Sequence, residues 1–239
     1  QIGLPAYVGA FFNLKNPVLS NAKLRQAFAY STDRKAIIND SLGGQGAIAY
    51  YPIPAGFVGF NGAAQKYQYD EAKAQELIQQ AGVGKNNLRL VTLNNPVYKK
   101  VAEKLAESWR KLGQNVEIIT ADNVELQQNY IRSRNYDILL YGQNIGLDSD
   151  VYSFWHSSQV SDPGLNVSFY KNSEVDQLLE GFEILDHLGV VELVVLQCRL
   201  VDDDRYALGL DALNDALDAG CSEVVGAGLH NETVDADDF

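Results

Sequence analysis

The chain has 239 residues, 46% of them hydrophobic, so it is long enough to bury a substantial core as one large or two small domains. Its formal net charge is −12 at pH 7, and no dense cluster of lysine and arginine is present, which argues against a nucleic-acid partner. No apolar run approaches the roughly 20 residues of a membrane span. The N-terminal residues lack the charged and apolar regions of a signal peptide, and methionine is absent. We therefore expect a mature product, an excised piece or a fragment, with any export signal outside this chain.

The acidic charge is concentrated at one end of the chain. Residues 1–183 hold 17 Lys and Arg against 18 Asp and Glu, whereas residues 184–239 hold 2 against 13. This contrast predicts a boundary near residues 181–187, with an acidic tail of unknown origin that is fused or frame-shifted onto the first unit. Both cysteines, Cys198 and Cys221, lie in that tail. A disulfide and two buried thiols are equally consistent with their number.

The first third of the chain predicts a strand, two helices and a loop. Residues 7–14 form the expected strand, and Asn21 is placed to cap the first helix. Asp33 is placed to cap a second helix over residues 34–42, which two glycines end. Residues 43–68 are rich in Gly, Ala, Tyr and Pro without a helical period, and we expect a long ordered loop there.

From residue 70 the pattern alternates between helix and strand. Asp70 is placed to cap a helix that ends at Gly82, and Pro96 stands in the first turn of another that ends at Gly113. Such alternation implies parallel neighbouring strands with right-handed crossovers, and hence an α/β lobe. The expected elements that follow Gly82 are a strand at 88–93, a helix at 96–112, a strand at 116–120, a helix at 123–133 and a strand at 136–141.

The sequence pattern in the remaining third of the chain is less regular. Residues 166–170 suggest another strand, and Ser173 opens a helix with Asp176 at the capping-box position. In the tail, we expect a strand at 190–196, an amphipathic helix over 206–217 and a frayed C-terminus.

The segment after the strand at 136–141 is the best candidate for a functional site. It is rich in acidic and aromatic residues, and open α/β sheets usually hold ligands just past the carboxyl end of such a buried strand. The polar and aromatic side chains concerned are Asn144, Asp148, Asp150, Tyr152, Trp155 and His156.

Several chemistries fit these residues. Asp148 and Asp150 could serve a hydrolase together with His156, but paired catalytic carboxylates are normally split across a cleft, and no nucleophile motif accompanies the histidine. The Asp-Ser-Asp sequence starts like a calcium loop but lacks the third ligand and the glycine of that motif. Asp150 could instead cap a short helix, and core packing is the default for Trp155. No phosphate-binding loop is present. We therefore expect neither a metal nor a cofactor.

Binding of an ammonium group is a more specific hypothesis for this segment than hydrolysis or calcium binding. A carboxylate in a partly dry cleft pairs strongly with a cation, and nearby aromatic rings add cation–π contact. Asp148, with Tyr152 and Trp155 beside it, would suit the N-terminus of a peptide.

A series of motifs resembles a known family. Residues 24–38 read Leu-Arg-Gln-Ala-Phe-Ala-Tyr-Ser-Thr-Asp-Arg-Lys-Ala-Ile-Ile, which is similar to the Arg-Gln-Ala…Asp-Arg signature of family 5 extracellular solute-binding proteins, the peptide- and nickel-binding receptors of ABC importers. The similarity covers residues 7–183 in the family's order. It continues at 69–74 and 77–82, at 112–116, at 136–138, in the 148–158 loop and at 172–179.

The resemblance implies a periplasmic-binding-protein-like lobe of type II, with a mixed sheet flanked by helices, in a protein that encloses ligand by hinge closure. In the family, an acidic residue of the corresponding loop meets the α-ammonium of a peptide, a role that would fall to Asp148 or Asp150. The matched part corresponds to the later lobe only. The expected partners are thus a peptide or small solute, the missing first lobe and the ABC permease subunits.

A member of this family would be a binding protein without catalysis, located in the periplasm or on the cell surface. Because half a cleft cannot bury a ligand, we expect weak or no binding by this chain alone. The competing expectations are the hydrolase described above and a binding-incompetent fragment with an unrelated tail.

Overall fold

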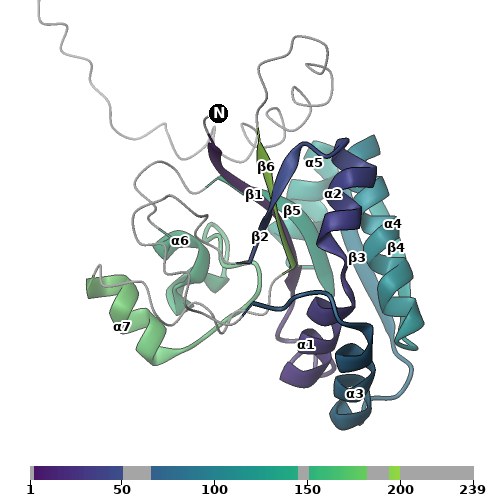
Figure 1. Cartoon of the computed structure of the whole chain (residues 1–239). Helices are drawn as coiled ribbons and strands as arrows, with labels where there is room; N and C mark the ends of the chain where they lie inside the picture. Colours follow the sequence, from purple (N-terminus) through teal and green to yellow (C-terminus); the bar gives the residue numbers. More distant parts are fainter. Residues whose placement is uncertain (1–2, 51–65, 145–150, 182–193, 200–239) are drawn as a thin grey trace, which may run out of the picture.

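The computed structural model describes residues 3–50, 66–144, 151–181 and 194–199 (Figure 1). Its centre is a six-stranded mixed sheet with the strand order β2-β6-β1-β5-β3-β4. β3 runs parallel to β4 and β5, whereas β1 runs antiparallel to β5 and β6, and β2 runs antiparallel to β6. The strands are β1 Gly3–Phe12, β2 Gly46–Ala49, β3 Asn87–Leu93, β4 Asn115–Ala121, β5 Ile138–Asn144 and β6 Val194–Arg199.

The first four helices begin at side chains that cap them. Asn21, Asp33, Asp70 and Asn95 each accept a hydrogen bond from a backbone N–H of the first turn, which satisfies a donor that has no partner within the helix. The caps predicted at the first three of these positions are confirmed. The helices are α1 Ala22–Ser31, α2 Arg34–Leu42, α3 Glu71–Ala81 and α4 Pro96–Lys111, of which α2 and α3 end at Gly43 and Gly82 with φ of 59° and 62°.

Side chains of β1 divide the core between the two faces of the sheet. Phe12 packs against Phe28 of α1 and Trp109 of α4, with ring centroids 5.8 Å away in each case. Its neighbour Phe11 points to the other face, where its ring lies 6.4 Å from that of Trp155. This is the alternation that a strand with two covered faces requires. Figure 1 shows α1, α3 and α4 to one side of the sheet and the segment with α6 and α7 to the other.

The chain between β4 and β5 is helical, as predicted, but not uniformly so. Asp122 caps α5 Asn123–Glu125, and Leu126–Ile131 continues as a π-helix before a turn in which Arg134 has a φ of 56°. After the acidic segment that follows β5 come two short elements and a longer one. They are α6 Tyr152–Trp155, the 3₁₀-helix Ser157–Val160 and α7 Ser173–Gly181.

The structure differs from the sequence-based expectation in two segments. Residues 43–68 contain the strand β2, whose partner β6 lies about 150 residues further along the chain and could not be paired with it by local pattern. Residues 166–170 form turns and not a strand. The side chain of Asn166 donates to the carbonyl of Tyr170 and accepts from its N–H, and Phe169 has a φ of 56°, which a strand does not allow.

The one described segment beyond residue 183 belongs to the same sheet. β6 occupies Val194–Arg199, shifted from the predicted 190–196, and pairs with β1 on one side and β2 on the other. The division of the chain at 183/184 stays a prediction, as does the origin of the tail. Cys221, the helix expected at 206–217 and the C-terminus lie outside the described residues. Among the helices that are described, none combines the length and hydropathy needed to cross a membrane.

Candidate ligand-binding site

The candidate site lies where β5 ends. β5 runs through the centre of the sheet to Asn144, and the described chain resumes at Val151, the N-cap residue of α6. Asp148 and Asp150, the predicted ammonium ligands, fall between these points and lie outside the described residues. The structure therefore defines both ends of the acidic segment and the side chains around them.

Asn144 and Tyr152 flank this segment. Asn144 is the last residue of β5, is exposed, and lies opposite Ala6 of β1. Tyr152 is the first residue of α6, is partly buried, and stacks on His156 with ring centroids 4.3 Å apart and an interplanar angle of 13°. Their role in ligand binding remains a prediction, and both positions are compatible with it.

Trp155 lies in the core. Its side chain is 1% exposed and packs against Phe11 and, edge to face, against Tyr170 with a centroid distance of 6.4 Å. Core packing, the default expectation for this residue, describes its position in this chain. The burial of Trp155 does not support its predicted role as a surface beside the ligand, and that role stays a prediction.

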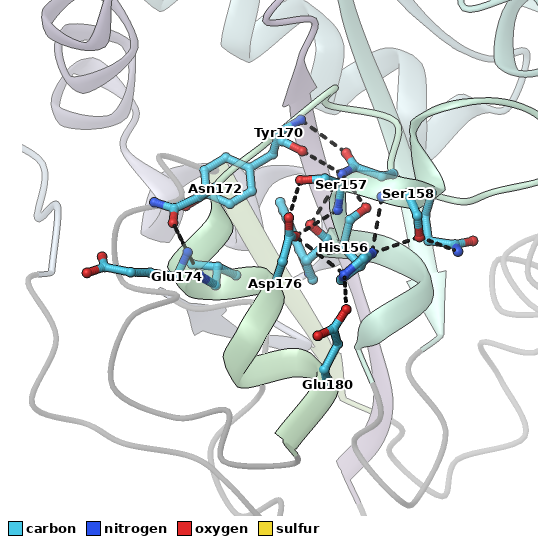
Figure 2. Close-up of polar contacts among 12 residues, drawn as sticks. His156, Ser157, Ser158, Tyr170, Asn172, Glu174, Asp176 and Glu180 are labelled. Atoms are coloured by element: carbon cyan, nitrogen blue, oxygen red, sulfur yellow. Dashed lines mark hydrogen bonds and ion pairs between the residues drawn. The ribbon is translucent and has the colours of Figure 1, made fainter.

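His156 is held by polar groups on both sides of its ring (Figure 2). The N–H of Ser158 donates to Nδ1 over 3.1 Å, so the neutral ring carries its proton on Nε2. Nε2 lies 3.4 Å from Oε1 of Glu180 and 3.8 Å from Oδ1 of Asp176, both on α7. A histidine placed in this way connects α6 to α7.

Asp176 completes the connection between these helices. Its carboxylate accepts hydrogen bonds from the N–H of Ser157 over 2.8 Å and from the Ser157 hydroxyl over 2.5 Å (Figure 2). The prediction that Asp176 belongs to a capping box is wrong, because the cap of α7 is Asn172, whose side chain accepts from the N–H groups of Glu174 and Val175. Asp176 lies one position too far along the helix, and its side chain is free to bind a different segment.

A buried pair joins β1 to β5 just before the acidic segment. Tyr7 donates a hydrogen bond of 2.5 Å to Oε1 of Gln143, and the side chains are 1% and 6% exposed. Burial raises the pKa of the Tyr7 hydroxyl far above its ordinary value, while the indole of Trp155 beside it acts in the opposite direction. The hydroxyl is thus a neutral donor throughout the physiological range. Sequence reasoning missed this pair because its members are 136 residues apart.

A metal site finds no support in the described part of the chain. No group of three or more His, Cys, Asp or Glu side chains there is arranged to hold an ion.

Comparison with known proteins gives consistent matches. The oligopeptide-binding protein AppA of Bacillus subtilis is 29% identical over 194 residues, which are 73% of this chain and 35% of AppA. The probable D,D-dipeptide-binding periplasmic protein DdpA of Escherichia coli is 31% identical over 173 residues, 71% of this chain and 33% of DdpA. The chain thus spans about a third of the length of these relatives.

Solved structures show the same fold. AppA of Bacillus subtilis in complex with a nonapeptide superposes with a TM-score of 0.73 at 24% identity, covering 83% of this chain and 45% of AppA. HbpA2 from Haemophilus parasuis gives 0.74 at 21% identity, with 82% and 43% covered. The predicted periplasmic-binding-protein-like fold of type II, with a mixed sheet flanked by helices, is confirmed.

The family model described as bacterial extracellular solute-binding proteins, family 5 Middle, matches residues 4–164. This range holds well over half of the chain, including β1 apart from its first residue, β2 to β5 and α6. The chain belongs to the family 5 bacterial extracellular solute-binding proteins.

Proposed function

We propose that this chain is the later lobe of the substrate-binding component of an ABC importer, and that the complete protein binds peptides or similar small solutes for uptake. The observation that carries the proposal is the match to the family over residues 4–164, which includes the acidic segment between β5 and α6. As a family member the chain is a binding protein and not an enzyme, and its place of action is the periplasm or the cell surface.

The ligand class follows from the chemistry of the candidate site and from the relatives. Asp148 and Asp150 follow the central strand β5 in the sequence, and a carboxylate past the carboxyl end of such a strand could pair with an ammonium group in a partly dry environment. Relatives include an oligopeptide-binding and a dipeptide-binding protein, and also the heme-binding protein A of Haemophilus influenzae. Peptides with a free N-terminus fit both lines of argument best.

The hydrolase alternative finds no support in the arrangement of His156. Nδ1 accepts from Ser158, Nε2 faces two carboxylates, and the hydroxyl of Ser157 donates to Asp176 and not to the imidazole. A serine nucleophile needs its hydroxyl proton directed at a base such as this ring. The contacts around His156 instead stabilise the packing of α6 against α7.

A second lobe completes the site in this proposal. A type II receptor encloses its ligand between two lobes, and this chain spans about a third of its relatives' length. The missing first lobe would supply the other wall, and the permease subunits would receive the loaded receptor. Isolated, the 239-residue chain should bind peptides weakly or not at all, since a single wall leaves most of the ligand in water.

The test is calorimetry with trialanine and with N-acetyl-trialanine, on the isolated chain and on the complete receptor that contains it. The complete receptor should bind trialanine and discriminate against the acetylated peptide, which has no ammonium group. Replacing the anchoring aspartate, Asp148→Ala or Asp150→Ala, should cost about 2 kcal/mol or more. Asp162→Ala, which removes an exposed aspartate 3.9 Å from Arg132, is the matched control.

Unchanged affinity in both Asp148→Ala and Asp150→Ala, with no preference for the free amine, would sink the ammonium proposal. Micromolar affinity of the isolated chain would refute the need for a second lobe. Peptide hydrolysis that either substitution abolishes would favour the enzyme.

A further inference from the structure

Tyr152 and His156 form a stacked pair along α6. Their ring centroids lie 4.3 Å apart with an interplanar angle of 13°, as two residues four positions apart on a helix can. Val151 and Trp155, which are also four positions apart, are 0% and 1% exposed and face the core, whereas Tyr152 is only partly buried. Of the two aromatic ligand candidates, Tyr152 is therefore the one that the core does not enclose.

The imidazole of His156 is itself held at both of its nitrogens (Figure 2). The backbone N–H of Ser158 donates to Nδ1 over 3.1 Å, and the Ser158 hydroxyl lies 2.7 Å from the same nitrogen. Nε2 faces α7, where Oε1 of Glu180 lies 3.4 Å away and Oδ1 of Asp176 lies 3.8 Å away. His156 is 7% exposed, so its ring has little room to rotate. It therefore presents a fixed face to Tyr152.

We propose that His156 is a positioning residue for ligand binding, which fixes the ring of Tyr152 in the orientation that contacts the ligand. This inference rests on the proposed function, because Tyr152 belongs to the same candidate site. A side chain that is free to change rotamer must be ordered when ligand binds, which weakens binding by about threefold to tenfold. A ring that the imidazole already holds avoids much of this cost, and tyrosine provides both apolar and cation–π contact.

His156 has a second role that must be separated from the first. Its side chain is the N-cap of the 3₁₀-helix Ser157–Val160, through the contact with the N–H of Ser158. His156→Asn keeps an acceptor suited to this cap but removes the ring, since asparagine is among the preferred N-cap residues. His156→Phe keeps an aromatic ring for the stack but removes the acceptor. The two variants therefore give opposite results depending on whether stacking or capping matters.

The NMR spectrum of the Tyr152 ring in the full chain without ligand is the first measurement. Its proton signals are identified by comparison with Tyr152→Phe. His156→Asn should move these signals to the positions of an unstacked tyrosine, and His156→Phe should keep them displaced, with His156→Tyr serving the same purpose should His156→Phe not fold. Signals that stay unchanged in His156→Asn, or that move only in the variants that retain a ring, would overturn the proposal.

Peptide affinity of the complete receptor that contains this chain is the second measurement, with trialanine as the probe. His156→Asn should weaken binding about threefold to tenfold, whereas His156→Phe should stay within about twofold of the unsubstituted receptor. Tyr152→Ala should weaken binding at least as much as His156→Asn. The double variant should bind no more weakly than Tyr152→Ala alone, because the ring that His156 positions is gone. Unchanged affinity in His156→Asn, or additive losses in the double variant, would also overturn the proposal.

Failure of the proposed function gives a different result. A complete receptor that does not bind trialanine in its unsubstituted form refutes that function, and with it the role of His156 in ligand binding. A receptor that binds trialanine equally well with and without Tyr152→Ala keeps the function and refutes only the positioning of Tyr152 by His156 for ligand contact.

Discussion

Ser157 and Asp176 are joined by two hydrogen bonds, one from the backbone N–H over 2.8 Å and one from the hydroxyl over 2.5 Å. They connect the start of the 3₁₀-helix that follows α6 to the first turns of α7, and Nε2 of His156 lies 3.8 Å from the same carboxylate. A single carboxylate on α7 thus serves as the acceptor for the segment that follows the candidate ligand site. The position of α6 depends on this carboxylate as well as on the burial of Trp155.

We expect Asp176→Asn to lower the free energy of unfolding by about 2 kcal/mol, because the amide can accept from only one of the two Ser157 donors and the charge that strengthens both bonds is lost. Urea denaturation of the chain measures the change. Glu174→Gln, at an exposed position on the same helix, is the control and should change stability by less than about 1 kcal/mol. Equal losses in the two variants would show that the Ser157 contacts contribute nothing.

A second prediction concerns the turn between the 3₁₀-helix and Asn166. A Cβ added to Gly164 would lie 2.3 Å from the backbone carbonyl oxygen of Gln159, which itself accepts a hydrogen bond from the N–H of Asn166. Backbone cannot move aside as a flexible side chain can, so Gly164→Ala should destabilise the protein by about 2 kcal/mol or more. Thermal unfolding checks this. Gly84→Ala has no atom within 4 Å of the new Cβ and should be nearly neutral, and similar losses for both would contradict the explanation.

The helix ends could be predicted from the sequence because residues close together in the chain determine them. Asn21, Asp33 and Asp70 cap their helices through N–H groups two or three residues away, and Gly43 and Gly82 end them with left-handed backbone. The prediction of a strand at 166–170 was wrong because contacts with residues elsewhere in the chain determine the structure there. Its apolar residues suit a strand, but the amide of Asn166 also binds the carbonyls of Trp155 and His156, and these tertiary contacts override the local pattern.

The strand end at which the site is expected was predictable from the sequence, but the contacts around that strand end were not. The carboxyl end of β5 follows from a buried run that ends in polar residues, and the aspartates follow it in the sequence. The contacts that define the ends of the segment join Tyr7 to Gln143 and Phe11 to Trp155, pairs separated by more than 130 residues. The sequence around each residue does not reveal such a pair, since each residue by itself resembles any other residue of a hydrophobic core.

A third prediction concerns the ion pair between α2 and α4. The hydrogen bond with Lys104, over 2.7 Å, and its positive charge hold the pKa of Asp40 below the ordinary value. Because the folded pKa is the lower one, the contribution of Asp40 to stability is complete above the unfolded pKa of about 4 and is lost as the pH falls through the folded value. Carbon-detected NMR titration of the Asp40 carboxyl should show the depressed pKa.

In Lys104→Gln the pKa of Asp40 should move upward toward its ordinary value, and added salt should have a similar effect, since both groups are exposed to solvent. Lys73→Gln is the control, because Lys73 pairs with Glu76 on a different helix. A titration of Asp40 that neither Lys104→Gln nor salt alters would show that the ion pair does not form in solution.

The last prediction tests whether β6 is an integral part of the lobe. β6 pairs with β1 through Tyr7–Ala10 and with β2 through Gly46–Ala49, so within the described sheet it is the only strand that connects β2 to the rest. Removing residues 184–239 should therefore lower the urea midpoint and the far-UV signal of strand relative to removing residues 200–239, because the backbone groups of β1 and β2 lose their partners. The two truncated chains share the loss of the final acidic segment, which isolates the effect of the strand. Identical midpoints would place the structural boundary at 183, where the change in composition puts it, and would make β6 dispensable to the ligand-binding lobe.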